Sequence, residues 1–214
     1  MDVLAVGDVH GCYHTFKALV EKHWDPSREF LVQVGDLINK GKNSGKAYLY
    51  AQELEREYPY QVFFLKGNHE HRFIQFHRRK GSDRAIEACK KDFLKRDIDL
   101  RKAAGWFSNR PLKWENPYVL ITHAGISPFS KDPFGANARR GVLHNRGALK
   151  NVNKLQVHGH ILQTKGEPTF NEVSNSWCID TGAWTGQQLT AIRLSRKGKV
   201  RELLHEVTHP KDMS

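Results

Sequence analysis

The stretch VLAVGDVHGC, residues 3–12, places an acid and a histidine two positions apart where a short apolar run ends. The run VLAV is typical of a buried strand. Gly7 and Gly11 flank Asp8 and His10 and allow the backbone to turn sharply there. Residues two apart in an extended segment point the same way, so Asp8 and His10 can chelate one metal ion together.

The same arrangement recurs after later apolar runs. The runs at 30–34, 61–65, 118–122 and 155–157 are followed by GD (35–36), GNHE (67–70), HAG (123–125) and HGH (158–160). Ligands of open α/β sheets bind at the carboxyl ends of the strands. We therefore expect one shared site, whose candidate metal ligands are Asp8, His10, Asp36, Asn68, His123 and His160.

The donor types predict which metals this site would hold. Carboxylate, amide oxygen and imidazole without thiolate suit Mn, Fe or Zn better than Cu(I). The two oxygens of Asp36 can bridge two cations. Two ions roughly 3.5–4 Å apart can hold a hydroxide and clamp a phosphoryl group for in-line attack. The sequence thus predicts two divalent ions, with Mn²⁺ preferred and Fe or Zn as alternatives.

Strand and helix patterns alternate in the first half, and strands crowd the second. Further strands are expected at 177–179, 189–194 and 199–207, and helices at 15–24, 44–58 and 82–107. This order favours an α/β protein whose parallel sheet opens into mixed or antiparallel strands. We predict a single domain over residues 1–214, with a basic helical insert at about 71–110.

Composition narrows the classes of partner. The formal net charge of +11 favours an anionic substrate, and residues 71–102 carry 11 Lys and Arg against 5 Asp and Glu. That segment fits either a solvated helical face or a platform for a polyanion such as nucleic acid. No apolar run approaches membrane-spanning length, and the three cysteines are widely spaced, so we expect no membrane partner and a cytoplasmic location. The segment GKNSGKA (41–47) lacks the spacing and the Ser/Thr of a P-loop, which argues against an NTPase.

Seven segments together resemble the metallophosphoesterase superfamily, and within it the phosphoprotein phosphatase branch. They are GDVHG (7–11), GDLINKG (35–41), GNHE (67–70), THAGISP (122–128), LHNRG (143–147), VHGHI (157–161) and CIDTGAWTGQQLTAIRL (178–194). That branch includes bacterial and phage Ser/Thr phosphatases and diadenosine tetraphosphatase-like enzymes. The resemblance spans nearly the whole chain in order.

The resemblance implies two mixed β-sheets packed as a sandwich and flanked by helices, and it implies roles at matching positions. The first metal would be held by Asp8, His10 and Asp36, and the second by Asp36, Asn68, His123 and His160. His69 would protonate the leaving oxygen, and Arg146 would bind phosphate oxygens. His158 lies on the same face of its segment as His160 and is a further candidate to line the site.

The sequence departs from the family pattern in one block, where GDxVDRG reads GDLINKG. Asn39 stands in place of the acid that pairs with the GNHE histidine, and Lys40 in place of a phosphate-binding arginine. Asn39 can still orient His69 through its carbonyl, but without a negative charge the pKa of His69 should be lower than with an Asp partner. Lys40 offers charge to phosphate without a bidentate fork. These two positions leave the substrate class open.

Three functions remain in competition. The leading expectation is a Ser/Thr protein phosphatase-like phosphomonoesterase acting on a phosphoprotein. The alternative is a hydrolase of dinucleoside polyphosphates or of nucleotide or RNA ends, which the changes at Asn39 and Lys40 and the basic 71–102 segment favour. A phosphate- or RNA-binding pseudoenzyme is the third, and the complete ligand set argues against it.

Overall fold

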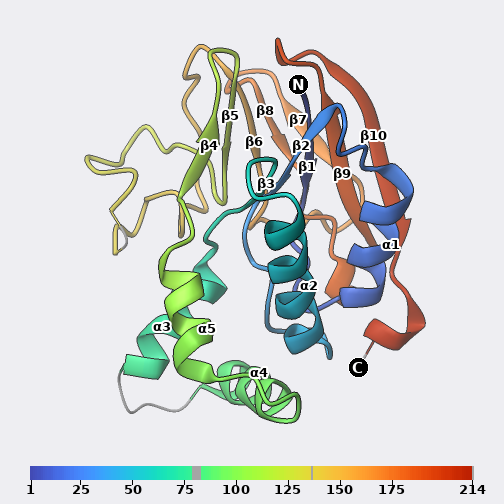
Figure 1. Cartoon of the computed structure of the whole chain (residues 1–214). Coiled ribbons are helices and arrows are strands. Elements are labelled where there is room, and N and C mark those ends of the chain that lie inside the picture. Colours follow the sequence, from blue (N-terminus) through green and yellow to red (C-terminus); the bar gives the residue numbers. More distant parts are fainter. Residues whose placement is uncertain (79–82, 136, 214) are drawn as a thin grey trace.

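Two five-stranded sheets pack face to face, with helices on the outside (Figure 1). The computed structural model describes residues 1–78, 83–135 and 137–213. The first sheet has the order β10-β9-β1-β2-β3 and the second β4-β5-β6-β8-β7. The strands are β1 (Asp2–Val6), β2 (Glu29–Gln33), β3 (Val62–Phe64), β4 (Lys113–Glu115), β5 (Val119–Thr122), β6 (Leu155–His158), β7 (Thr169–Asn171), β8 (Ser176–Cys178), β9 (Gln188–Leu194) and β10 (Val200–Val207).

Both sheets mix parallel and antiparallel pairs. In the first sheet, β1 and β3 run parallel to β2, whereas β9 runs antiparallel to β1 and to β10. In the second sheet, β5, β6 and β8 are parallel neighbours, and the short edge strands β4 and β7 are antiparallel. The predicted fold class, two mixed sheets in a helix-flanked sandwich, is confirmed.

The strand β1 shows why the apolar run is continuous. Val3 and Ala5 point between the sheets, where they meet Val157 of β6 in one core. Leu4 and Val6 point to the other face, into the core that the helices cover. Because each side chain of a buried central strand faces a core, the sequence shows no polar alternation.

The first two helices cover the outer face of the first sheet, and the other three pack together beside the second helix. The helices are α1 (Tyr13–His23), α2 (Ser44–Glu57), α3 (Asn68–Arg78), α4 (Arg84–Leu94) and α5 (Leu100–Ser108), with short 3₁₀ turns η1 (Ala183–Thr185) and η2 (Pro210–Asp212). Phe16 of α1, Phe73 of α3 and Phe107 of α5 are fully buried in the helix-side core. Among the described residues, no helix is long and apolar enough to cross a membrane.

The prediction of one helix over 82–107 is wrong. Two helices, α4 and α5, occupy this range, and its first residue, Ser82, lies outside the described residues. Asp97 has a left-handed φ of 55°, which ends the helical path. The carboxylate of Asp99 then accepts from the backbone N–H groups of Arg101 and Lys102 and starts α5.

Candidate metal centre

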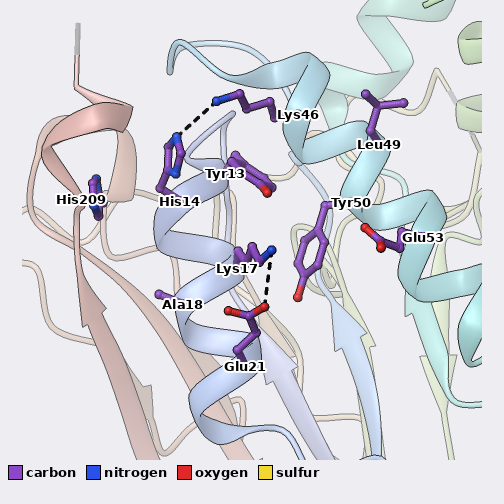
Figure 2. A pocket seen from close by; sticks show the side chains of 10 residues that line it. All are labelled: Tyr13, His14, Lys17, Ala18, Glu21, Lys46, Leu49, Tyr50, Glu53 and His209. Carbon is purple, nitrogen blue, oxygen red and sulfur yellow. Dashed lines mark hydrogen bonds and ion pairs between the residues drawn. The ribbon is translucent and has the colours of Figure 1, made fainter.

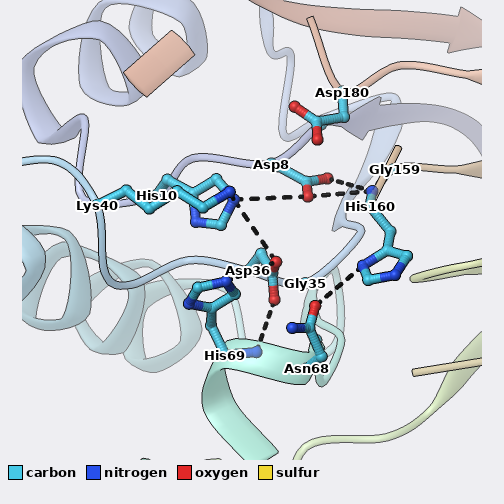
Figure 3. A network of polar contacts seen from close by, with 12 residues as sticks. Asp8, His10, Gly35, Asp36, Lys40, Asn68, His69, Gly159, His160 and Asp180 are labelled. Carbon is cyan, nitrogen blue, oxygen red and sulfur yellow. Dashed lines mark hydrogen bonds and ion pairs between the residues drawn. The ribbon is translucent and has the colours of Figure 1, made fainter. Parts of the chain in front are cut away.

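The predicted ligands meet at the carboxyl ends of the strands, as Figure 3 shows for most of them. Asp8 and His10 follow β1, Asp36 follows β2, and Asn68 begins α3 just after β3. His123 follows β5 and His160 follows β6, so both sheets contribute. His10, Asp36 and His160 have left-handed φ values of 47°, 56° and 68°, which turn these side chains at the strand ends.

One group of ligand atoms lies around Asn68. Its Oδ1 is 2.9 Å from His123 Nε2 and 3.0 Å from His160 Nδ1. The two imidazole nitrogens are 3.1 Å apart, and His123 Nε2 is 3.5 Å from Asp36 Oδ1. Burial lowers the pKa of His123 to about 3 and also lowers that of His160, so both rings are neutral and offer lone pairs.

The second group lies around His10. Its Nε2 is 3.5 Å from Asp36 Oδ2 and 3.9 Å from Asp8 Oδ2. His10 Nδ1 is 3.2 Å from the carbonyl of Ile38, a contact in which the ring N–H donates, which places the lone pair of the neutral ring on Nε2. His69 Nε2 is 3.9 Å from Asp36 Oδ2, so the geometry also places His69 within reach of this group.

Asp36 is oriented to serve both groups. Its Oδ1 faces His123 and its Oδ2 faces His10, while the backbone N–H of His69 donates to Oδ1 at 2.9 Å. Gly67 makes this approach possible, because a Cβ at that position would lie 2.2 Å from Asp36 Oδ1. Each oxygen of the Asp36 carboxylate therefore belongs to one candidate metal position.

The residues fit divalent cations on electrostatic grounds as well. Burial raises the pKa of Asp8 well above its usual range, and the neighbouring carboxylates Asp180 and Asp36 add to this. Such a cluster is costly unless positive charge compensates it. The ammonium of Lys40 lies 2.9 Å from His10 Nε2, where it donates to that lone pair, so one cation already occupies this neighbourhood. The preference for Mn²⁺ stays a prediction.

Glu70 is a site residue that the sequence analysis missed. It is 1% exposed. Its Oε2 accepts from the backbone N–H groups of Asp36 and Gly67, both at 2.8 Å, and its Oε1 from those of Leu37 and Ile38 at 3.0 and 3.3 Å. One carboxylate thus fixes the turn that presents Asp36. The signal was the last letter of GNHE, an acid in the first turn of the helix that Asn68 begins.

Replacing Glu70 with glutamine should destabilise the fold by about 2–4 kcal/mol, because the new amide NH₂ faces backbone donors and leaves them unsatisfied at about 1–3 kcal/mol each. Urea unfolding of Glu70→Gln measures this. Glu53→Gln, at an exposed position on α2, is the matched control and should change stability by less than about 0.5 kcal/mol. Equal stabilities for the two variants would refute the scaffolding role of Glu70.

The pairing predicted for His69 and Asn39 is present, but the amide nitrogen of Asn39 makes it. The carbonyl oxygen, which was expected to orient His69, has no hydrogen-bond partner among the described residues. Asn39 Nδ2 lies 2.9 Å from His69 Nδ1, and both side chains are buried. In this orientation the amide donates to Nδ1, so the proton of neutral His69 sits on Nε2, the nitrogen that faces Asp36. Burial lowers the pKa of His69, the Asp36 carboxylate opposes this, and Lys40 lowers the pKa further.

The other predicted residues border the centre. Lys40 Nζ also lies 4.5 Å from the ring centroid of Trp184. Arg146 is exposed in the loop after β5 and lines a cavity there. His158 Nδ1 lies 3.0 Å from the carbonyl of Gly159, and His158 belongs to neither group of candidate ligands.

Asp180 is, after Glu70, a second site residue that the sequence analysis missed. It is buried near Asp8 (Figure 3), and burial raises its pKa to about 6. In the sequence, Asp180 could have been noticed as the acid of the IDTGA segment (179–183), which belongs to one of the blocks that resemble the family.

Comparison with known proteins decides the family. The family model described as calcineurin-like phosphoesterase matches residues 1–183. The chain belongs to this family. The predicted superfamily is thereby confirmed, and this phosphoesterase is metal-dependent by family, with the Asp and His groups above as the residues that could hold the ions.

A curated relative and two solved structures are similar to this chain. A symmetrical bis(5'-nucleosyl)-tetraphosphatase of Photorhabdus laumondii is 30% identical over 131 residues, which are 60% of this chain and 46% of that protein. The chain thus matches less than half the length of this curated relative. A structure provisionally assigned as a diadenosine tetraphosphatase has a TM-score of 0.68 at 19% identity, covering 97% of this chain and 95% of its own. A Ser/Thr phosphatase of Saccharomyces cerevisiae has a TM-score of 0.69 at 19% sequence identity, and the match covers 98% of this chain and 81% of that structure. At this identity, both structures support only the assignment of the fold.

Proposed function

We propose that this phosphoesterase hydrolyses the phosphoanhydride chain of dinucleoside polyphosphates. The observation that carries the proposal is the similarity to symmetrical bis(5'-nucleosyl)-tetraphosphatases over 60% of the chain. This support favours what the sequence analysis held as the alternative over its leading expectation, a Ser/Thr protein phosphatase. The likeness to the yeast phosphatase does not restore that expectation, since it concerns only the fold.

The partner of His69 supports the same choice. An acid beside a catalytic histidine stabilises its protonated form, which matters most when the leaving group is a poor one, such as a serine alkoxide. Asn39 gives no such charge, and Nδ2 donating to Nδ1 competes with protonation there. A phosphate leaving group needs little protonation, so a phosphoanhydride suits the Asn39–His69 pair better than an alkyl phosphate does.

Two cationic cavities, one of which includes Lys40 beside His10 and the other Arg146, also fit a polyphosphate. One, of about 480 Å³, is lined by Asn39, Lys40, Gly41, Lys42, Ser44, Arg84, Ala85, Ala88, Cys89 and Asp92. The other includes Arg139, Arg140 and Arg146. A phosphomonoester carries its phosphate at one end, whereas a polyphosphate extends negative charge to both sides of the reacting phosphorus.

The basic helical segment, by contrast, gives less support to nucleic acid. Several of its described cations are paired within the segment: Arg72 with Asp83, Lys90 with Glu87 at 3.2 Å, and Arg96 with Asp92 at 3.0 Å. Such pairs are typical of a solvated helical face. An RNA-binding role for residues 71–102 remains an expectation.

The residues of the centre have separate roles in the proposed reaction. Asp8, His10, Asp36, Asn68, His123 and His160 would hold the divalent ions, which supply Lewis-acid polarisation of the phosphoryl group and a more acidic water. Lys40 and Arg146 bind oxygens of the phosphates. His69 Nε2, 3.9 Å from Asp36 Oδ2, faces the centre and donates its proton to the leaving oxygen when that oxygen needs one.

A substrate panel with Mn²⁺ tests the proposal. Diadenosine tetraphosphate should be hydrolysed with a kcat/KM at least about tenfold above that of a phosphoserine peptide, which corresponds to about 1.4 kcal/mol of transition-state discrimination. A 5′-phosphorylated RNA and p-nitrophenyl phosphate complete the panel. Higher kcat/KM for the phosphopeptide would overturn the proposal in favour of the protein phosphatase.

Restoring the acid with Asn39→Asp should raise the pKa of His69, because a negative charge favours the imidazolium. The alkaline limb of the pH–rate profile, on which the acid loses its proton, should then move to higher pH. The gain in rate should be larger for the phosphoserine peptide than for diadenosine tetraphosphate. Profiles of both variants with both substrates measure this, and unchanged profiles for both substrates would show that position 39 is not coupled to the proton donor.

A further inference from the structure

A cavity of about 370 Å³ lies in the long connection between β5 and β6, which projects from the sheets at the left of Figure 1. Its lining residues are Ser127, Phe129, Arg139, Arg140, His144, Asn145, Arg146, Gly147 and Ala148. The three arginines were related above to the charge of a polyphosphate, and Phe129 and the other lining residues have no role in the reaction described so far. The sequence analysis predicted nothing for the other residues.

This cavity is held in a fixed position beside the metal centre. The backbone N–H of Ala124, which follows the ligand His123, donates to the carbonyl of Val142 at 2.7 Å. The side-chain amide of Asn145 donates back to the carbonyl of Ala124 at 3.5 Å. The wall of the cavity is therefore attached directly to the residue that follows a candidate metal ligand.

The charged side chains that line the cavity are all cationic. Arg139, Arg140 and Arg146 line it, all three are exposed, and none of the described residues that line it carries a carboxylate. The cavity between α1 and α2 makes a useful contrast (Figure 2). There Lys17 and Lys46 are matched by Glu21 and Glu53, and Lys17 Nζ is 3.5 Å from Glu21 Oε1. Of these two cavities, the arginine-lined one therefore suits a polyanion.

An aromatic ring stands at the same cavity. The side chain of Phe129 is 67% exposed, and the guanidinium carbon of Arg140 lies 5.1 Å from the centroid of its ring. Exposed aromatic rings and guanidinium planes are the groups on which nucleobases stack, and every base offers such a face. Arginines beside an exposed ring thus match a ligand that joins phosphates to a base.

We propose that this cavity binds one nucleoside end of the substrate, with the base stacked on Phe129 and the non-reacting phosphates held by Arg139 and Arg140. The inference rests on the proposed function and adds its specificity determinants. Recognition by stacking, without hydrogen bonds to base edges, should favour the larger purine face over a pyrimidine.

Three substrates separate the parts of this site: diadenosine tetraphosphate, inorganic tetraphosphate, which lacks nucleosides, and p-nitrophenyl phosphate. Phe129→Leu, which keeps an apolar side chain without a ring, should raise the KM for diadenosine tetraphosphate by about 5- to 100-fold, the range expected for one lost base stack. Its kcat should be unchanged, because the ring contributes equally to ground-state and transition-state binding. The KM for the other two substrates should stay within twofold of wild type.

Arg140→Gln should raise the KM for both polyphosphates and spare p-nitrophenyl phosphate. Phe170→Leu and Arg201→Gln, at exposed positions on β7 and β10, are the matched controls and should leave the KM for all three substrates unchanged. If wild type hydrolyses diadenosine tetraphosphate but Phe129→Leu does not change its KM, the nucleoside site is refuted and the proposed function stands. If wild type hydrolyses only p-nitrophenyl phosphate, the proposed function falls, and this inference falls with it.

Discussion

Asp36→Asn should abolish binding of both metal ions, whereas Asp8→Asn should weaken the binding of one. The two oxygens of Asp36 face different histidines, His123 at 3.5 Å from Oδ1 and His10 at 3.5 Å from Oδ2. An asparagine offers a single carbonyl oxygen and no charge to share. Because even outer-shell substitutions lower metal affinity by about 10- to 100-fold, the loss of a shared ligand should exceed that range at each position.

Metal content after dialysis, determined by mass spectrometry, measures this difference, and activity after chelation and re-addition of Mn²⁺ or Mg²⁺ accompanies it. Near-UV circular dichroism of both variants establishes that the fold survives. Mn²⁺ should restore turnover more readily than Mg²⁺, since the site offers imidazole nitrogens. Loss of the same single ion in both variants would contradict the bridging position of Asp36.

His69→Asn should slow hydrolysis of an alkyl phosphate by about 10²- to 10⁴-fold, the range expected on losing a general acid. Diadenosine tetraphosphate and p-nitrophenyl phosphate should lose less, because their leaving oxygens need little protonation. Metal content should stay near wild type if His69 acts on the substrate. Steady-state rates for the three substrates, together with metal analysis, give both readouts.

The geometry makes that metal analysis informative, since His69 Nε2 and His10 Nε2 lie 3.9 and 3.5 Å from the same oxygen of Asp36. If His69 were a ligand in place of Asp8, the variant would lose an ion and all substrates would slow equally. That result would reassign His69, and Asp8→Asn would then retain its full metal content.

The central strands were predictable because each carries its own hydrophobic signal. VLAV of β1 is buried on both faces, and its continuous apolar run is visible without any knowledge of its neighbours. The edge strands β4 (KWE) and β7 (TFN) were missed, since three mostly exposed residues form a strand only by pairing with β5 and β8.

The prediction for residues 82–107 was right that the segment is helical and wrong that it forms one helix. The amphipathic pattern continues across the break between α4 and α5, so periodicity alone suggests one helix. What ends it is local: the left-handed backbone of Asp97 and the cap formed by Asp99. No separate helix was predicted for α3, which overlaps the predicted helical insert at about 71–110 but begins earlier, at Asn68, inside a motif read for its ligands.

The candidate ligands could be named in advance because each follows its strand directly in sequence. Glu70 could not, since its role depends on hydrogen bonds to amides 32 to 34 residues away, at Asp36, Leu37 and Ile38. The cavity with Phe129 and Arg140 was equally hidden, because the connection from β5 to β6 has no periodic pattern and its cations gather only in three dimensions.

The division of the ligands between the sheets has a consequence for unfolding. Asn68 follows the edge strand of one sheet, and His123 and His160 follow neighbouring strands of the other, so an ion shared among them cross-links the two halves of the sandwich. An ion present at about 100 times its dissociation constant adds about 2.7 kcal/mol to the free energy of unfolding. The concentration of the metal ion thereby affects how firmly the two sheets stay together as well as the reaction. A chelator should make the protein easier to digest with proteases.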